Sequence, residues 1–408
     1  MQHLTAEHGR ADQAKKADQS PSVMMVDASN FSLSYDHCLC DALQRMGCEV
    51  TLARSEDIHG SWDVPTCFEV WNKFYPRTHA YARSHARGRF WKVAKLGEHL
   101  ASMKELLGQV ERSNPDVVHF QWLPVPAFDT LFLSRLRRVA PLVLTLHNTT
   151  VFHGTAGRLH GVGLRSALKQ FDAIVVHTEY SRRQAIERGI EPRRLHVIPH
   201  GALTHYRELS DIKPKARADR VVLFFGNLKE YKGVDVLVRA FANLPAEVKQ
   251  TTILQIVGKP SMDVGPLQAL SKELGVAHRI KWELRFVEEH EVPGIFREAS
   301  VVCLPYREID QSGVLLTAIA FDRAVVASNV GGIAETIQDG VHGWLVAPGD
   351  VGSLSIALER ALQDPGQLRT MESAVSSLRQ ELAWEKIAQK TVELYRTLDR
   401  RTVQKRAA

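Results

Sequence analysis

The sequence lacks any long apolar run, and its few cysteines are not arranged in pairs. No segment of the 408 residues approaches the roughly 18 apolar residues that a membrane-spanning helix needs. The five cysteines have neither the spacing of a metal site nor that of a disulfide framework. Residues 1–20 are polar and lack the apolar stretch of a signal peptide, so we expect them to be disordered. These absences predict a cytoplasmic protein with reduced thiols.

Several catalytic motifs are also missing. The chain contains no G-x-x-x-x-G-K-[ST] phosphate loop, and no G-x-G-x-x-G follows its first expected strand, which disfavours dinucleotide oxidoreduction. Its histidines form no H-E-x-x-H pattern, which argues against metal-dependent hydrolysis. We therefore expect neither a metal nor a cofactor.

Acidic residues are absent between Trp71 and Gly97, although the chain as a whole has a formal net charge of only +6. Within this segment basic residues alternate with aromatic ones. One interpretation is a segment that lies on an anionic membrane, on the inner face of the cytoplasmic membrane. The other is a solvated basic face with a few aromatic side chains packed inward. The net charge favours anionic partners without choosing among nucleic acid, nucleotides and lipids.

Short β-branched runs alternate with longer amphipathic segments along most of the chain. This alternation is typical of parallel α/β domains, and continuous apolar character suits strands that are covered on both faces. The expected strands are residues 22–28, 49–54, 116–121, 142–147, 173–178 and 195–200, followed by 220–226, 251–258, 279–284, 300–306, 324–329 and 342–348. The expected fold class is therefore α/β, with two Rossmann-like, doubly wound domains.

A polar stretch separates the two sets of strands. Residues 204–219 contain one proline and no clear periodicity, which is typical of a linker between domains. We expect domains at 21–203 and 220–383, and a helix within 384–408 that packs back across the domains and precedes a basic tail. Ligands of such sheets bind at the carboxyl ends of the strands. Function is therefore expected in strand-to-helix loops that face a central cleft.

Two of these loops have the composition of an anion site. After one strand, Gly226 and Asn227 are followed by Lys229 and Lys232, at the start of a helix. Backbone N–H groups, positive charge and a helix N-terminus together suit a phosphate or diphosphate. A solvated pair of lysines is the alternative that the spacing leaves open.

The second loop has a Q-S-G tip, formed by Gln311, Ser312 and Gly313, directly before an apolar helix. Such a tip presents the unpaired N–H groups of the first helical turn. Thr317 lies one turn further along and either offers its hydroxyl to a ligand or bonds to its own helix.

The second half of the chain resembles the nucleotide-sugar domain of the retaining glycosyltransferases with the GT-B fold, the group 1 or family 4 type. The matching motifs are G-N-L-K-E-Y-K-G-V-D-V-L (226–237), R-F-V (285–287), L-P-Y (304–306), A-I-A-F-D-R-A-V-V-A-S (318–328), V-G-G-I-A-E (330–335) and D-G-V-H-G-W-L-V (339–346). Weaker similarity extends to H-F-Q-W, T-L-H-N, H-T-E-Y-S and V-I-P-H-G in the first half. The resemblance implies a GT-B fold with two domains around a central cleft.

The resemblance also implies a role for each matching residue. Lys232, with Lys229 or Asn227, would neutralise the donor diphosphate and so stabilise the leaving group without a metal. The other donor-binding positions that the resemblance implies are Gly226 in the first loop, Gln311, Ser312 and Gly313 at the diphosphate, and Arg285, Phe286 and Val287 at the nucleotide base.

The chain departs from the family pattern at two carboxylates. Many members carry two glutamates eight positions apart, and the corresponding residues here are Ile309 and Thr317. Glu308 and Asp310 flank the first position and are the expected substitutes. The usual arginine after Gly226 is also replaced, by Asn227.

On the acceptor side, His147 ends an expected strand and precedes a polar loop. The resemblance implies that a histidine at this place bonds to the donor sugar or orients the acceptor. The expected catalytic residues are therefore His147, Lys232 and Lys229.

The expected function is retaining transfer of a hexose from a GDP- or UDP-linked sugar to a lipid-linked or saccharide acceptor, in exopolysaccharide or cell-envelope glycan synthesis. The missing glutamates favour one alternative, a non-catalytic nucleotide-sugar-binding partner. A nucleotide-sugar epimerase of similar fold is another. Binding of nucleic acid through net charge alone is a third, and without a recognition motif we expect no specific complex.

Overall fold

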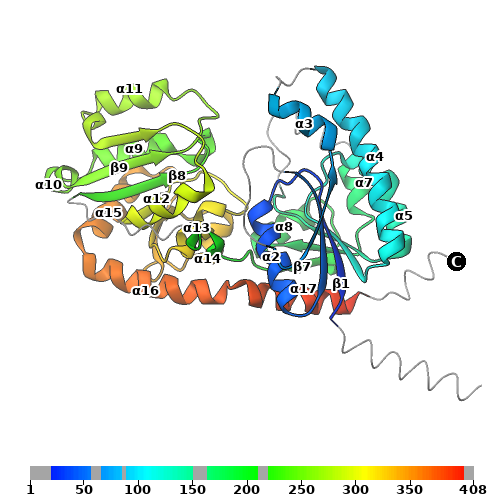
Figure 1. Ribbon diagram of the computed structural model, residues 1–408. Coiled ribbons are helices and arrows are strands. Elements are labelled where there is room, and N and C mark those ends of the chain that lie inside the picture. The colour runs from blue at the N-terminus through cyan, green and yellow to red at the C-terminus, as the bar shows by residue number, and fades with distance from the viewer. Residues whose placement is uncertain (1–19, 57–65, 85–88, 150–162, 210–218, 399–408) are drawn as a thin grey trace, which may run out of the picture. The chain divides into compact units, whose positions relative to one another are not determined.

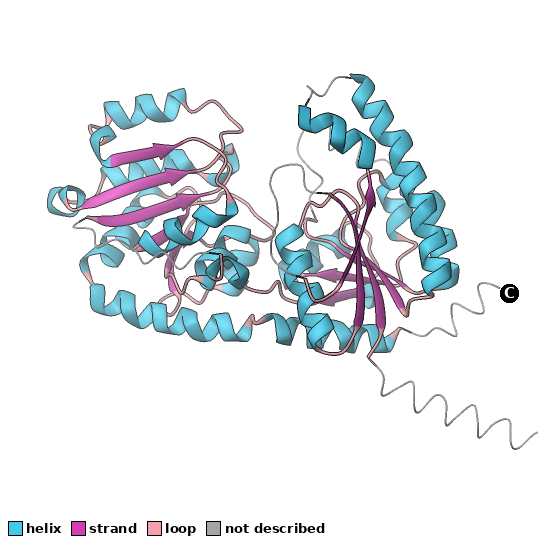
Figure 2. Ribbon diagram, in the orientation of Figure 1, coloured by secondary structure: helices cyan, strands magenta, loops and turns pink. Residues whose placement is uncertain are grey.

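The computed structural model describes residues 20–56, 66–84, 89–149, 163–209 and 219–398. These residues form two compact units, each built on its own parallel sheet (Figures 1 and 2). The first unit contains the chain up to His177, then Arg182–Pro199 and the segment from Trp384 onwards. The second contains Thr178–Ser181 and His200–Ala383. The expected disordered terminus and basic tail, and most of the expected linker, lie outside the described residues.

The first unit has a seven-stranded sheet in the order β3-β2-β1-β4-β5-β6-β7. Its strands are β1 (Ser22–Asp27), β2 (Glu49–Ser55), β3 (Glu69–Phe74), β4 (Val117–Phe120), β5 (Leu142–Thr145), β6 (Ala173–Val176) and β7 (Leu195–Val197). The helices are α2 (Leu33–Arg45), α3 (Pro76–Ser84), α4 (Arg89–Ser113), α5 (Pro126–Val139), α7 (Leu164–Leu168), α8 (Glu179–Glu187) and α17 (Trp384–Thr397). All residues of β4, β5 and β6 are buried, because helices cover both faces of the sheet.

The second unit has a six-stranded sheet in the order β10-β9-β8-β11-β12-β13. Its strands are β8 (Arg220–Phe225), β9 (Thr252–Val257), β10 (Ile280–Glu283), β11 (Val301–Leu304), β12 (Val325–Ser328) and β13 (Gly343–Val346). The helices are α9 (Val234–Ala242), α10 (Ala246–Gln250), α11 (Gly265–Glu273), α12 (Val292–Glu298), α13 (Gly313–Ala320), α14 (Gly331–Thr336), α15 (Val351–Gln363) and α16 (Pro365–Glu381). The start of the expected linker, Thr204–Arg207, is a short 3-10 helix that contacts α12 and α13.

All twelve expected strands are present, and one further strand, β3, was not expected. β3 pairs with β2 at the edge of the first sheet and ends inside the segment that lacks acidic residues. Its residues alternate little between buried and exposed positions, so the periodicity gave no signal. The long helix α16 was also missed, since only two of its side chains are buried.

The last helix, α17, belongs to the first unit. It packs along α2 and buries Trp384, Ile387 and Tyr395. The Tyr395 hydroxyl lies 2.6 Å from Nδ1 of His119, whose Nε2 lies 2.8 Å from the Thr145 hydroxyl. Burial lowers the pKa of His119 to about 3, so its ring is neutral. The C-terminal segment is thus tied to the centre of the first sheet by a buried hydrogen bond.

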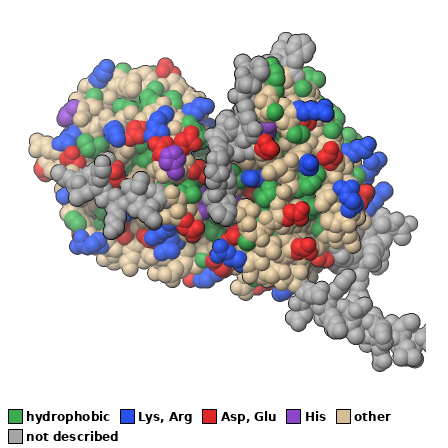
Figure 3. All heavy atoms as spheres, viewed as in Figure 1, with side chains coloured by type: hydrophobic (Ala, Val, Ile, Leu, Met, Phe, Trp, Pro, Cys, Tyr) green, Lys and Arg blue, Asp and Glu red, His purple; other side chains and the backbone are tan. Residues whose placement is uncertain are grey.

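Two further properties concern the described residues as a whole. No helix among them is both long and apolar enough to cross a membrane. On the face seen in Figure 3, Lys and Arg side chains are scattered among Asp and Glu.

The Tyr395 bond yields a stability prediction. Tyr395→Phe leaves Nδ1 of His119 buried without this partner, so the free energy of unfolding falls by about 1–2 kcal/mol in urea denaturation. The control Tyr180→Phe, at a partly exposed tyrosine of α8, changes it by less than about 0.5 kcal/mol. Equal effects of the two variants would contradict the role of the His119 bond.

Candidate active site

The Q-S-G tip forms the N-terminus of α13. The Ser312 side chain caps the helix by accepting a hydrogen bond from the backbone of Leu315 at 3.2 Å, and its own N–H donates to Gln311 Oε1. Gly313 is exposed, and its N–H belongs to the first turn, which has no acceptor within the helix. The tip therefore has the geometry of an anion site.

Lys232 ends the short 3-10 helix Glu230–Lys232 and is buried, with a relative exposure of 8%. Its Nζ lies 5.4 Å from the centre of the ring of Tyr306, a residue between the end of β11 and the Q-S-G tip. Burial, and secondarily the charge of Lys229, lowers the pKa of Lys232 to about 8. A positive charge is thus held where water solvates it poorly, and an anion beside it would stabilise that charge.

Gly226 brings this ammonium and α13 together. A Cβ atom at Gly226 would lie 2.8 Å from Lys232 Nζ and 3.3 Å from a methyl group of Val314, in the first turn of α13. The φ angle of Gly226 is +102°, a conformation that other residues rarely adopt. The two loops with the composition of anion sites therefore converge beside one glycine.

The exposed neighbours extend this site. Asn227, Lys229 and Glu308 are exposed, whereas Asp310 is buried. Lys229 and Glu308, together with Arg307, line a cavity of about 570 Å³. Arg307 is held there by Asp235 at 2.8 Å.

Thr317 bonds to its own helix, which was the second of the two interpretations. Its hydroxyl donates to the Gly313 carbonyl at 2.9 Å, and the residue is buried. The donor-binding role of Thr317 therefore stays a prediction without support from its hydroxyl, because α13 already uses that group.

The R-F-V segment, Arg285 to Val287, follows β10. Arg285 makes two bonds to Glu291, at 2.8 and 2.7 Å, and this pairing lowers the pKa of Glu291 to about 2. Phe286 is 54% exposed. The guanidinium thus stiffens the loop, while the phenyl ring offers an apolar surface of the kind on which a base stacks.

Gly331 and Gly332 pack directly on the backbone of the Q-S-G loop. A Cβ atom at Gly331 would overlap the Ile309 carbonyl oxygen, and the N–H of Gly332 donates to the Asp310 carbonyl at 3.0 Å. This close approach, rather than a simple turn, explains the two glycines.

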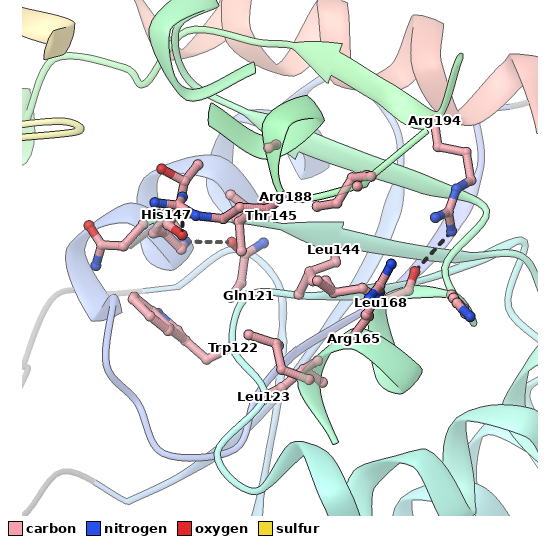
Figure 4. A pocket seen from close by; sticks show the side chains of 18 residues that line it. Gln121, Trp122, Leu123, Leu144, Thr145, His147, Arg165, Leu168, Arg188 and Arg194 are labelled. Atoms are coloured by element: carbon pink, nitrogen blue, oxygen red, sulfur yellow. Dashed lines mark hydrogen bonds between the residues drawn. The ribbon is translucent and has the colours of Figure 1, made fainter. Parts of the chain in front are cut away.

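In the first unit, His147 lies at the end of β5 beside an apolar cavity of about 250 Å³ (Figure 4). The Trp122 ring stacks on His147, with centroids 5.1 Å apart and an interplanar angle of 17°. Nε2 of His147 lies 3.1 Å from Gln121 Oε1, and its Nδ1 lies 3.2 Å from Nε2 of His177. Basic residues line the cavity as well: Arg165, Lys169, Arg188 and Arg194.

Sequence reasoning missed several of these neighbours. Tyr306, Gln121 and Trp122 each follow the end of a strand, which is a signal that could have located them. Two buried carboxylates at β1 and α2, Asp27 and Asp36, were also missed; burial raises the pKa of both. Among the described residues, no group of three or more His, Cys, Asp and Glu side chains could hold a metal ion.

The glycine packing predicts an asymmetric effect of two alanine substitutions. Gly331→Ala forces the backbone at Ile309 to move and lowers the free energy of unfolding by about 2–3 kcal/mol. The matched control is Gly275→Ala, where φ is also positive (+71°) but nothing lies within 4 Å, and it costs about 1 kcal/mol. Urea denaturation of both variants measures the difference, and equal losses would mean that the close approach is unimportant.

Comparison with known proteins agrees with this architecture. A family profile described as "Glycosyl transferases group 1" matches residues 219–364, and one described as "Glycosyltransferase Family 4" matches residues 37–205. A D-inositol 3-phosphate glycosyltransferase of Kribbella flavida is 30% identical over 310 residues, 69% of this chain and 71% of that protein. The enzyme of the same name from Rhodococcus jostii is 27% identical over 285 residues, 65% of this chain and 63% of that protein.

Solved structures with the same fold are more distant in sequence. Sucrose-phosphate synthase from Thermosynechococcus elongatus has a TM-score of 0.69 at 18% identity, with 92% of this chain and 98% of that chain covered. HepE from Anabaena, solved with UDP and glucose, has a TM-score of 0.66 at 18% identity, with 93% of this chain and all of that chain covered. These matches confirm the resemblance and the expected fold class. The chain belongs to the group 1, family 4 glycosyltransferases and is a glycosyltransferase with the GT-B fold.

Proposed function

We propose that the protein transfers a sugar from a nucleotide-diphosphate sugar, with retention of configuration at the anomeric carbon. The observation that carries the donor class is the buried Lys232 ammonium beside Gly226 and the N-terminus of α13. Fixed positive charge and oriented N–H groups stabilise the diphosphate as the glycosidic bond breaks. Metal is not needed for this step, because the lysine supplies the charge that a cation would otherwise provide.

The nucleotide base is proposed to lie against Phe286. Its ring is exposed and belongs to a loop that the Arg285 pair with Glu291 stiffens. A base that stacks there would lie at the carboxyl edge of β10, two strands away from β8 in the sheet. The HepE structures contain UDP or UDP-glucose, which makes uridine diphosphate sugars the first donors to test, ahead of GDP-linked ones.

The acceptor is proposed to be anionic, and either lipid-linked or a saccharide. The cavity beside His147 combines leucine side chains with four basic residues. An acceptor that carries a phosphate would suit these basic residues. It could be a sugar or cyclitol phosphate, or a lipid-linked phosphate. The two relatives named above act on an inositol phosphate, which belongs to the first class. Glycan assembly at the inner face of the cytoplasmic membrane is the proposed setting for the lipid-linked acceptor.

A non-catalytic nucleotide-sugar-binding role is the second candidate. One observation favours it: the family glutamate positions are Ile309 and Thr317, and the Thr317 hydroxyl bonds within α13. Under the primary proposal, Glu308 or Asp310 contacts the donor sugar instead.

Turnover distinguishes the two candidates. The protein is incubated with UDP-, GDP- and ADP-linked sugars, with soluble sugar phosphates and with a bacterial lipid extract, and release of nucleoside diphosphate is measured. We expect release with one donor, an α-linked product from an α-linked donor by NMR, and no effect of a metal chelator. Lys232→Ala lowers the rate by about a hundredfold or more, because it removes the charge that faces the leaving group.

The matched control is Lys272→Ala, at an exposed lysine of α11, which leaves the rate unchanged. Tight binding of a nucleotide sugar without release, for every acceptor tested, would favour the binding role. A product with inverted configuration at the anomeric carbon would refute the proposed retention but not the proposed sugar transfer.

A further inference from the structure

A line of hydrogen bonds crosses the carboxyl edge of the first sheet. Four neighbouring strands, β4, β5, β6 and β7, each contribute one group shortly after they end. These groups are Gln121, His147, His177 and the carbonyl of Ile198, with separations of 3.1, 3.2 and 3.0 Å along the line. His147, which was expected at the site, is therefore one member of this line of hydrogen bonds.

The protons in this line of hydrogen bonds can be assigned from its Ile198 end. The Ile198 carbonyl oxygen can only accept, so Nδ1 of His177 carries the proton that it donates at 3.0 Å. His177 is 4% exposed, and burial lowers its pKa to about 4, so its ring is neutral near pH 7. Its Nε2 then carries a lone pair and must accept. The donor that faces it, at 3.2 Å, is Nδ1–H of His147.

We propose that His177 is a positioning residue, which keeps the proton of His147 on Nδ1 and leaves Nε2 of His147 as the nitrogen that meets the substrate. In an isolated imidazole the two tautomers exchange freely, and a fixed acceptor at one nitrogen selects one of them. The partner at Nε2 suits either state of the ring. Gln121 Oε1 accepts from a protonated Nε2, and the same amide turned over donates to a neutral one.

Packing fixes the plane of the His147 ring, so that its two nitrogens stay in the line of hydrogen bonds. Trp122 stacks on one face, and the edge of the Tyr35 ring meets His147 with centroids 4.9 Å apart at 90°. Tyr35 also lies 5.4 Å from the His177 ring, so one side chain of α2 braces both histidines. His147 and Gln121 both line the cavity in Figure 4, where the side chain of Gln121 reaches the imidazole ring. The bond that a substrate hydroxyl makes would therefore be directed at Nε2.

This inference rests on the proposed function for its consequence. If the protein transfers a sugar, a hydroxyl of the donor sugar or of the acceptor replaces the Gln121 amide and donates a hydrogen bond to the neutral Nε2, and the sugar is held in one orientation. The tautomer itself does not depend on that function and can be measured in the protein without any substrate.

The experiment combines a spectroscopic readout with two variants at one position. ¹⁵N-histidine-labelled protein is examined by long-range ¹H–¹⁵N NMR, with His147→Gln to assign the His147 signals. In the wild type we expect a pyrrole-type shift for Nδ1 of His147 and a pyridine-type shift for Nε2 in the neutral ring. His177→Phe keeps the size of the ring but offers no acceptor, and the His147 signals should move to the Nε2–H tautomer or to an average of both.

His177→Gln is the conservative variant, because its amide oxygen accepts from Nδ1 of His147 and its amide nitrogen donates to Ile198. We expect it to restore the wild-type tautomer. In the turnover assay, His177→Phe should lower kcat about tenfold, the size of one lost hydrogen bond, while His177→Gln recovers most of the rate. His119→Gln is the control for loss of a buried histidine, since His119 bonds to Thr145 and Tyr395 instead, and it should leave the His147 shifts unchanged.

An Nε2–H tautomer in the wild type would overturn the proposal, whatever the activity. Equal loss of kcat in His177→Phe and His177→Gln, in proportion to lost stability, would also overturn it, because it would indicate a structural role only. Absence of turnover with every donor would count against the proposed function, and the NMR shifts would then decide the His177 proposal by themselves.

Discussion

The loops at the carboxyl edge of the second sheet surround one buried cation, Lys232. Lys232 has a lowered pKa that arises from burial and from the charge of Lys229, and no carboxylate of the described residues contributes to the shift. A buried charge of this kind costs free energy until an anion lies beside it. The surrounding elements are arranged around that requirement: Gly226 leaves room for the ammonium, Tyr306 covers it, and α13 directs its first N–H groups to the same place. The buried charge therefore lowers the stability of the empty protein, and a bound anion would offset this loss.

Both units place their polar groups at the carboxyl ends of parallel strands. In the second unit these groups follow β8, β10 and β11, and they suit a diphosphate and a base. In the first unit they follow β4, β5, β6 and β7, and they form the line of hydrogen bonds through His147 and His177. Parallel strands make this possible, because every strand ends at the same edge and a helix begins directly afterwards. Two sheets of the same kind therefore present different polar groups on their loops.

Sequence reasoning predicted the strands and the helix start at the Q-S-G tip well, because both depend on local pattern. Alternation of apolar runs with amphipathic segments marks a buried parallel strand, and a Q-S-G tip before an apolar helix marks a helix N-terminus. β3 and α16 were missed, since edge strands and half-exposed helices have weak periodicity. Of the two interpretations of Thr317, the one that the structure shows is the bond of its hydroxyl within α13. The role of Gly331 escaped, because its close approach to Ile309 is revealed only by the packed backbone.

The central claim is that Lys232 meets the diphosphate of the donor, and proton uptake on binding tests it most directly. With a pKa of about 8, Lys232 is half protonated at pH 8, and a bound diphosphate would raise that pKa. Calorimetry of UDP binding in two buffers of different ionisation enthalpy should show uptake of about half a proton at pH 8 and less at pH 7. Lys232→Arg should abolish the uptake, because a guanidinium stays protonated in this range. Binding of UDP without proton uptake at pH 8, or uptake that persists in Lys232→Arg, would contradict the account.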